Sequence, residues 1–260
     1  MLDENANTFI GYAPEHKRLK IKNFHSDSVS TSASASYLRS RLNFNLVSQN
    51  YKIYFQLQDT RLLGDQNNSP SIPGGQNSSP SFHQLFGELN GILGSKNKTR
   101  FGRFEMPLGN QRIFSNNNWN ENGRSFEGIT NILKTKNGNI LFFHLINAYL
   151  FPMNDQFDYV VNGLYGTTKT NFFRSKKQTI DSNKTPAKNS PLNLDYYYYN
   201  EDIVLTPNTN TKQRRTYGLR VFKKFKSIGF EAEFAFQNGE YYSDKINASL
   251  SSINLSLIHI

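Results

Sequence analysis

Four arginines fall in segments that alternate between polar and apolar residues, each on the polar side of the alternation: Arg39, Arg41, Arg103 and Arg220. On an extended strand, alternate residues point to the same face, so these side chains would project among other polar groups. A guanidinium group can hold a carboxylate through two parallel hydrogen bonds, which makes the set a candidate for binding anions. Any one arginine on a strand is more often a solvated or ion-paired residue than a ligand contact, so the hypothesis concerns the set.

Acidic residues accompany the arginines at similar positions: Glu105, Glu127, Glu231 and Glu233. Beside arginines that line a passage, they would be counter-charges that keep the guanidinium groups ordered and anion binding weak. Glu231 and Glu233 could also be read as the carboxylate pair of a glycosidase. Because they are two residues apart on a strand, a shared polar face is the simpler interpretation.

Other catalytic patterns are missing from the sequence. The histidines are scattered without metal-ligand spacing: His16, His25, His83, His144 and His259. No Gly-x-Ser-x-Gly motif or phosphate-binding loop occurs. We therefore expect no enzyme, no metal site and no cofactor.

The stretch from Arg100 to Gly128 organises the chain. Residues 99–106 alternate as a strand would, and Pro107 and Gly109 end the pattern because proline cannot donate to the ladder. The following loop, 110–123, holds six asparagines and the only tryptophan, Trp119. An extended pattern resumes at Arg124. We expect Arg112, Trp119 and Arg124 to fix this loop rather than contact a solute.

This stretch resembles the central signature of the alginate export family of outer-membrane β-barrels. The matching elements are Gly102-Arg103, Glu105, Gly109 with Arg112, Asn118-Trp119, and Arg124-Ser125-Phe126-Glu127-Gly128. The Leu-Gln-Asp-x-Arg run ending at Arg61 resembles the family too. The resemblance covers 37–260. It implies an antiparallel up-and-down transmembrane barrel in the outer membrane of a Gram-negative cell, passing acidic polysaccharide through a cation-lined lumen, where Arg39, Arg41, Arg103 and Arg220 would lie.

Composition agrees with strands that have one oily and one wet face. Of the 260 residues, 19 % are charged and 37 % hydrophobic, with 21 Phe and 14 Tyr. Cysteine is absent, so a disulfide framework is excluded. The net charge of +10 is spread along the chain, and no nucleic-acid-binding motif occurs, which leaves an anionic surface or an anionic solute as the partner. The resemblance adds outer-membrane lipid as an expected partner. No run of 18 apolar residues exists, but barrel strands need only about 9–11 alternating residues.

The pattern predicts about ten strands in an all-β fold. Predicted hairpins include 37–58, 129–150 around the Asn137-Gly138 turn, and 215–237. Residues 26–36, 64–81, 171–191 and 200–214 are predicted loops. In a barrel the four consecutive tyrosines, Tyr196 to Tyr199, are expected in the aromatic girdle at the lipid headgroups, whereas in a soluble protein they would suggest a sugar-stacking face.

We expect an N-terminal segment, 1–36, with one possible strand, followed by a barrel region, 37–260. Residues 1–10 are acidic and lack the apolar core of a signal peptide, and the family's barrels are larger than this chain. Since unpaired strand edges cannot sit in lipid, the chain is expected to be an incomplete member that lacks the signal peptide and the closing strands.

Three functions remain open from the sequence. The first is an outer-membrane porin of the alginate export type that passes anionic oligosaccharides or other anions. The second is a general porin without a polysaccharide role. The third is a soluble β-sandwich or β-solenoid that binds acidic glycans, which would show the same alternation with its oily faces packed together.

Overall fold

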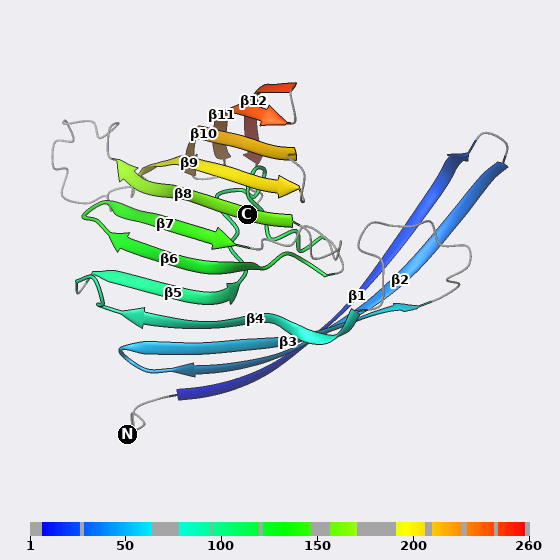
Figure 1. Cartoon of the computed structure of the whole chain (residues 1–260), viewed down its shortest axis with the longest axis horizontal. Coiled ribbons are helices and arrows are strands. Elements are labelled where there is room, and N and C mark those ends of the chain that lie inside the picture. Colours follow the sequence, from blue (N-terminus) through cyan, green and yellow to red (C-terminus); the bar gives the residue numbers. More distant parts are fainter. Residues whose placement is uncertain are drawn as a thin grey trace, which may run out of the picture. The chain divides into compact units, whose positions relative to one another are not determined.

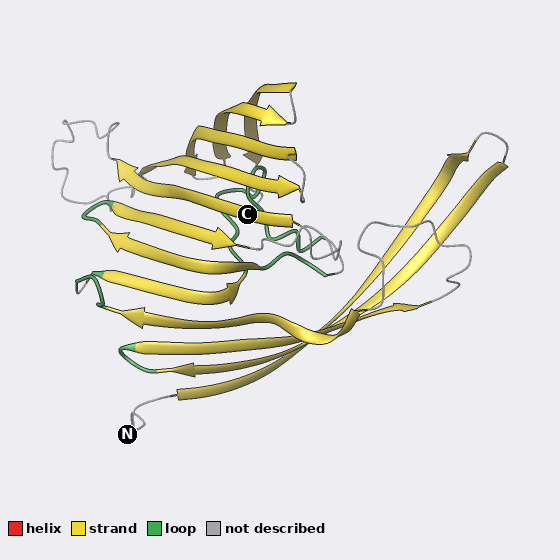
Figure 2. Ribbon diagram, viewed as in Figure 1, coloured by secondary structure: helices red, strands yellow, loops and turns green. Residues whose placement is uncertain are grey.

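The computed structural model describes residues 7–26, 29–63, 78–94, 96–119, 122–146, 157–170, 191–205, 210–224, 228–241 and 244–257. Within these ranges it consists of twelve strands and connecting loops, with no helix (Figure 2). The strands are β1 (Asn7–Ser26), β2 (Val29–Val47), β3 (Tyr51–Leu63), β4 (Ser78–Asn90), β5 (Asn97–Phe104), β6 (Phe126–Lys134), β7 (Gly138–Ile146), β8 (Phe157–Thr170), β9 (Leu192–Leu205), β10 (Asn210–Lys224), β11 (Ile228–Tyr241) and β12 (Asp244–Leu257).

The strands follow one another in a single sheet in chain order, from β1 to β12 (Figure 1). The ladders are antiparallel, so the chain runs up and down. This confirms the predicted all-β, up-and-down architecture. The described part of the chain contains no helix long and apolar enough to cross a bilayer.

Several boundaries differ from the prediction. The Ser-rich residues predicted as a loop largely belong to β2, which begins at Val29 and pairs with β1. Residues 78–81 belong to β4 rather than to the loop before it, and β9 and β10 extend into the predicted loop 200–214. Neighbouring strands provide hydrogen-bond partners that the local β-propensity of Ser and Asn does not reveal. The predicted loop 171–191 lies outside the described residues except for Pro191.

The chain divides into two compact units, which are considered separately below. The first unit comprises Met1–Ile129 and Leu145–Gln156, and the second comprises Thr130–His144 and Phe157–Ile260. In each unit the strands separate a polar from an apolar face, because residues directly opposite each other across a ladder point to the same side.

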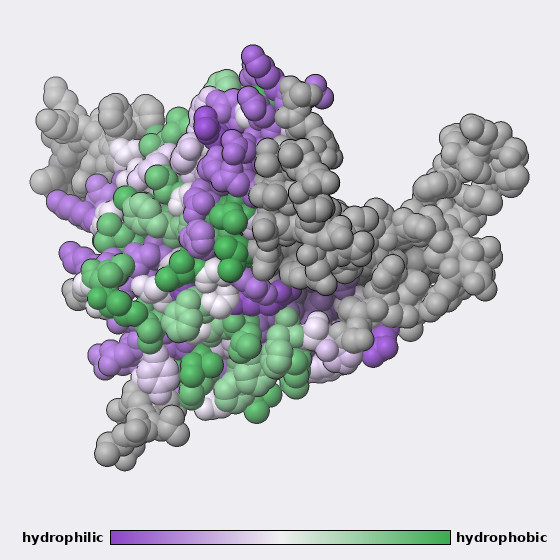
Figure 3. Space-filling model, viewed as in Figure 1, coloured by the Kyte–Doolittle hydropathy of each residue, from purple (hydrophilic) through white to green (hydrophobic). Residues whose placement is uncertain are grey.

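In the first unit, β2 and β3 show this separation clearly. Arg41 lies opposite Gln58 on the polar face, whereas Phe44 lies opposite Phe55 on the apolar face, with ring centroids 4.9 Å apart. Large apolar side chains are exposed on this apolar face (Figure 3). The predicted hairpin of these two strands is confirmed, including its turn, where the Ser48 amide donates to the Tyr51 carbonyl.

A β-bulge interrupts the ladder between β3 and β4. Gln56 pairs with Gln84 while the next residue, Leu57, pairs with Phe82, so His83 is the extra residue on β4. Bulges re-aim side chains locally. Both His83 and Gln84 therefore serve the polar face, on which the His83 ring is buried.

In the second unit the same separation governs β9, β10 and β11. Arg220 lies opposite Asp195 on one side and Glu233 on the other, whereas Leu219 lies opposite Tyr196 and Phe234. The hairpins predicted around Asn137-Gly138 and within 215–237 are confirmed over their described residues, and residues 147–150 and 225–227 lie outside them.

The alternation also separates the four tyrosines that were expected together in the aromatic girdle. Tyr197 and Tyr199 are buried on the polar face, 7 % and 2 % exposed, whereas Tyr198 is 42 % exposed on the apolar face. The expectation was wrong for Tyr197 and Tyr199, because consecutive strand residues point to opposite faces.

Gly163 lies where β8 passes close to its neighbours. A Cβ at this position would come within 2.5 Å of the Phe143 ring and 2.7 Å of the Tyr198 carbonyl oxygen. The carbonyl belongs to the paired strand and cannot move without disturbing the ladder. We predict that Gly163→Ala lowers the free energy of unfolding in detergent by about 1–3 kcal/mol, measured by urea titration.

Gly229→Ala is the matched control, because a Cβ there would meet nothing closer than 3.7 Å. Equal unfolding midpoints for the two variants would show that the close approach at Gly163 is not a constraint.

Candidate functional site

The carboxylate of Glu105 connects two strands of the first unit to the segment that follows β5. Oε1 accepts a hydrogen bond from His83 Nε2 at 2.7 Å and lies 3.3 Å from Arg41 Nη1. Oε2 accepts hydrogen bonds from the side-chain amides of Asn116, at 2.8 Å, and Asn118, at 3.4 Å. Glu105 thus joins β2 and β4 to residues 105–125, which we call the pinned segment; its residues 120 and 121 lie outside the described ranges.

Further contacts hold the pinned segment against the polar face. Gln58 Nε2 donates to the Asn122 carbonyl at 2.9 Å, and Arg41 Nη2 donates to Asn118 Oδ1 at 3.4 Å. The Ser125 hydroxyl donates to the His83 carbonyl oxygen. Left-handed backbone conformations at Gln111 and Asn117, with φ of 64° and 50°, let the segment fold back on itself.

Aromatic packing anchors the same segment. Phe114 stacks on Phe126 with centroids 4.9 Å apart, and both rings are buried. Phe104 and Met106 are also buried. The segment is therefore attached to the first unit by apolar contacts as well as through Glu105.

Glu105 follows the end of β5 and belongs to the pinned segment, and its surroundings lower its pKa. Its burial opposes ionisation, but the hydrogen bond from His83, the charges of His83 and Arg41 and the hydrogen bond from Asn116 together outweigh this effect. They hold the pKa of Glu105 below its ordinary value of 4.5. The carboxylate is consequently ionised, and its attachments are intact, at neutral pH.

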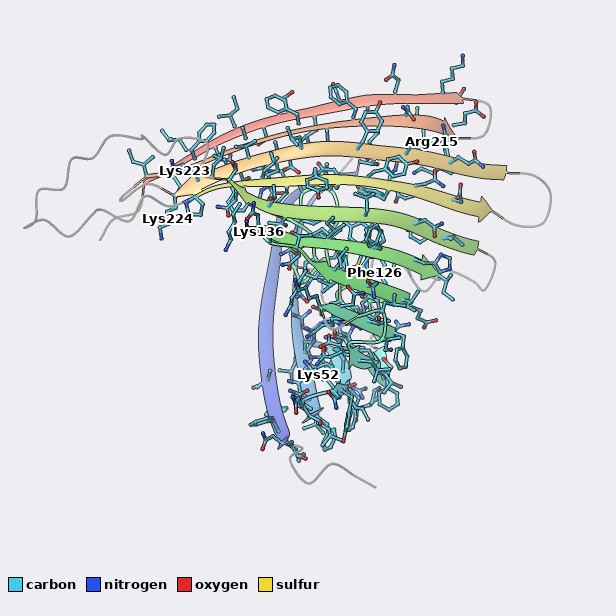
Figure 4. All side chains as sticks on the ribbon, turned by 90° about the vertical axis from the view of Figure 1, so that its left-hand side faces the viewer. Lys52, Phe126, Lys136, Arg215, Lys223 and Lys224 are labelled. Carbon is cyan, nitrogen blue, oxygen red and sulfur yellow. The ribbon has the colours of Figure 1, made fainter. Side chains whose placement is uncertain are left out.

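A second polar cluster of the first unit surrounds Glu88. Its Oε1 accepts from Lys98 Nζ at 2.7 Å, and its Oε2 accepts from Arg100 Nη2 at 2.9 Å. Lys52 lies directly opposite Glu88, with Nζ 5.6 Å from the centroid of the Phe86 ring; Figure 4 labels Lys52. We call Lys52, Glu88, Lys98 and Arg100 the Glu88 cluster.

The polar face of the first unit carries excess positive charge. Among the described side chains of β2–β5 on this face, together with Glu105, five cations stand against two carboxylates, a formal net charge of +3. The cations are Arg39, Arg41, Lys52, Lys98 and Arg100. Lys98 and Arg100 keep 36 % and 29 % of their side chains exposed, so they remain accessible to a solute.

The polar face of the second unit carries both signs of charge: Lys169, Lys212 and Lys224 lie on it beside a cluster of carboxylates and arginines. Arg220 donates to Asp195 at 2.6 Å and to Glu231 at 2.9 Å, and the Tyr165 hydroxyl also donates to Asp195 at 2.6 Å. Tyr197 donates to Glu233 at 3.0 Å.

Glu201 extends this arrangement, since it accepts hydrogen bonds from Tyr159 and Arg214. The two arginines of this tyrosine–carboxylate cluster, Arg214 and Arg220, face four carboxylates, and Lys212 lies on the same face two residues from Arg214. The carboxylates are Asp195, Glu201, Glu231 and Glu233.

The four arginines expected to line a lumen therefore lie in different surroundings. Arg39 is buried at 4 % exposure, and Arg41 belongs to the attachment of the pinned segment. Arg220 is shared between two carboxylates. Arg103 lies opposite Leu85, an exposed residue of the apolar face, and pairs with Glu127 at 2.8 Å, apart from the other three.

The loop residues of the signature also separate. The Arg124 guanidinium lies over the Phe126 ring at 5.8 Å. Arg112 is exposed, and its amide donates to Asn110 Oδ1. Trp119 is 75 % exposed, so its ring is not packed within the pinned segment.

Sequence reasoning missed the Glu88 cluster and His83. Lys52 shares the parity of Gln56 and Gln58, which already indicated a polar position. Lys98 and Arg100 could not be joined to Glu88 without the register of β4 and β5, and the bulge at His83 leaves no signal in the alternation. Among the described residues, no group of acidic, histidine or cysteine side chains could hold a metal ion.

A search of the curated proteins finds no significant match. Among solved structures, the crystal structure of Acinetobacter baumannii OccAB1 aligns with 93 % of this chain and 69 % of its own, at 11 % identity and a TM-score of 0.48. Vibrio cholerae OmpT, an outer membrane protein in its trimer form, aligns with 97 % of this chain and 84 % of its own, at 10 % identity and a TM-score of 0.37.

The family assignment rests on the match to a family model. The model that describes alginate export matches residues 21–255, nearly the whole chain. Its members are β-barrels of the outer membrane, which agrees with the up-and-down sheet and its two unlike faces. The chain is a channel protein of the outer membrane and belongs to the alginate export family.

Proposed function

We propose that this channel passes anionic solutes by diffusion, and that acidic oligosaccharides of the alginate type are among them. The observation that carries the proposal is the excess of cations on the polar face of the first unit. In a barrel the polar strand faces line the lumen, where low-dielectric walls strengthen the attraction of an anion to fixed cations. No catalytic step and no cofactor are part of this function.

The Glu88 cluster fits a site of weak, exchangeable binding. Glu88 holds Lys98 and Arg100 in place, and the cluster retains a formal charge of +2 for a solute carboxylate. The Arg100 guanidinium also lies 4.5 Å from the Phe86 ring centroid. A conducting site must release its solute as well as attract it, so a compensated cluster suits transport better than unpaired cations.

The predicted arginines take two roles in this proposal. Arg39 and Arg41 contribute to the positive field of the first unit, and Arg41 also fixes the pinned segment, which narrows the lumen. Arg220 balances the carboxylates of the second unit, and Arg103 stabilises the chain next to the pinned segment through Glu127.

A general porin without a polysaccharide role is the second candidate. The mixed charge of the polar face of the second unit supports it, because the carboxylates of the tyrosine–carboxylate cluster offset the cations of that face and so give no anion preference there. Block by an oligosaccharide separates the candidates.

Lys52→Gln/Lys98→Gln removes two cations while Arg100 still pairs with Glu88. We predict that the double variant lowers the anion-to-cation permeability ratio and weakens block by oligomannuronate about fivefold at low salt. The measurement is the reversal potential and single-channel block of the full-length protein in planar bilayers with a salt gradient.

Arg61→Gln is the control, since Arg61 pairs with Asp59 and lies opposite Leu38 of the apolar face. Anion-selective conductance steps that oligomannuronate does not block would support the general porin. A wild-type channel without anion preference would refute the proposed solute class.

The pinned segment gives a prediction for pH. Because the pKa of Glu105 is lowered, its attachments are fully present above pH 4.5 and are lost as the pH falls through the lower folded-state value. We predict that wild-type conductance becomes larger and noisier in that acidic window. Glu105→Gln should show this behaviour already at pH 7.

Asp59→Asn, the same change in a carboxylate paired with Arg61, should behave as wild type. If Glu105→Gln kept the wild-type conductance at both pH values, the segment would not be held through Glu105.

A further inference from the structure

The apolar face of the second unit ends in a row of polar side chains. The register places these residues directly opposite one another from β8 to β12: Asn162, Asn200, Arg215, Asn238 and Asn247. His144 on β7 joins the row, with Nδ1 2.6 Å from Asn162 Oδ1. We call these six residues the amide row.

An apolar row lies two residues further along the same strands. It consists of Leu164, Tyr198, Tyr217 and Phe236, again directly opposite one another. Tyr217 stacks on Phe236 with centroids 5.9 Å apart, and its hydroxyl accepts a hydrogen bond from Asn238 Nδ2 at 3.2 Å. The phenol is thus anchored in the amide row while its ring is exposed beside it, as in a side chain at a membrane interface.

The strand beyond this row has the length of a membrane crossing. In Figure 4, Arg215 lies toward one end of β10 and Lys223 and Lys224 lie at the other. Eight residues separate Arg215 from Lys223, about 27 Å along a strand and about 20 Å when the strand is tilted as in a barrel. This approaches the apolar band of about 25 Å in outer-membrane barrels, so the amide row lies at the level of the lipid headgroups.

A groove crosses the boundary between the two rows. Its volume is about 490 Å³, and its lining joins an apolar part, Phe142, Leu164 and Tyr198, to a polar part, Asn162, Asn200 and Arg215. Gly163 completes the lining. This open, shallow groove offers an acyl chain one end and a polar headgroup the other.

Arg215 gives the polar end its charge. The Arg215 side chain is exposed, and among the residues that the structure describes it forms no ion pair. Asp202, the outward carboxylate nearest along β9, accepts a hydrogen bond from Asn200 Nδ2 at 2.6 Å. A planar guanidinium flanked by amides matches a phosphate, which it can bind through two hydrogen bonds.

We propose that this groove binds one anionic phospholipid of the surrounding membrane. The phosphate contacts Arg215 with Asn162 or Asn200 beside it, and the first part of an acyl chain lies along Leu164, Tyr198 and Phe142. The proposal rests on the apolar face of an outer-membrane protein and is independent of the solute that the channel carries.

Native mass spectrometry of the purified full-length protein in detergent would test this site. The probes are dioleoylphosphatidylglycerol and dioleoylphosphatidylcholine, which share acyl chains but differ in net charge. We expect preferential retention of one phosphatidylglycerol, and a loss of that preference by about fivefold in Arg215→Gln. Lys169→Gln, which removes an exposed cation at the other end of β8, should keep it.

Three outcomes would overturn the proposal. The first is equal retention of both lipids by the wild type, and the second is an unchanged preference in Arg215→Gln. The third is displacement of phosphatidylglycerol by glycerophosphoglycerol, which has the headgroup without acyl chains and would show that the groove recognises a soluble phosphate ester. Heat-modifiable migration on gels verifies that each variant is folded.

Discussion

Residues that face each other across an antiparallel ladder share one side of the sheet, and everything else in this protein depends on that constraint. It places Arg220 among Asp195, Glu231 and Glu233, and it places the neighbouring Leu219 between Tyr196 and Phe234. A slip by one residue would exchange the two sets and bury the guanidinium in lipid. The ion pairs and the aromatic contacts on opposite sides of one strand therefore specify the same register.

The constraint explains how much the sequence alone could reveal. Strict alternation in 37–58 and 215–237 was sufficient to predict hairpins and faces, because each strand there keeps its period without interruption. The Ser-rich start of β2 has no such pattern, and it is a strand because β1 provides its partners. In the run Tyr196 to Tyr199 the prediction failed for a different reason. The shared residue type suggested one location, the aromatic girdle, whereas the alternation of strand residues places these tyrosines on two opposite faces.

The polar clusters were harder to predict because they depend on distant partners. The partners of Glu105 come from β2, β4 and the pinned segment. The most distant in sequence is Arg41, which is 64 residues away. Nor does the overall charge of +10 describe either polar face. The first unit carries more cations than carboxylates there, and the tyrosine–carboxylate cluster of the second carries fewer. The basic composition thus indicated an anionic partner but did not indicate which polar face would bind it.

The bulge at His83 shows that one additional residue in a strand can supply a functional side chain. Phe82 and Gln84 would alternate regularly if His83 were absent, because Leu57 and Gln56 already pair with them. The imidazole takes no part in the pairing of β3 with β4, and without it β4 would keep its polar and its apolar face. The one-residue insertion therefore supplies a buried hydrogen-bond donor to Glu105 without changing how the residues on either side of it pair with β3.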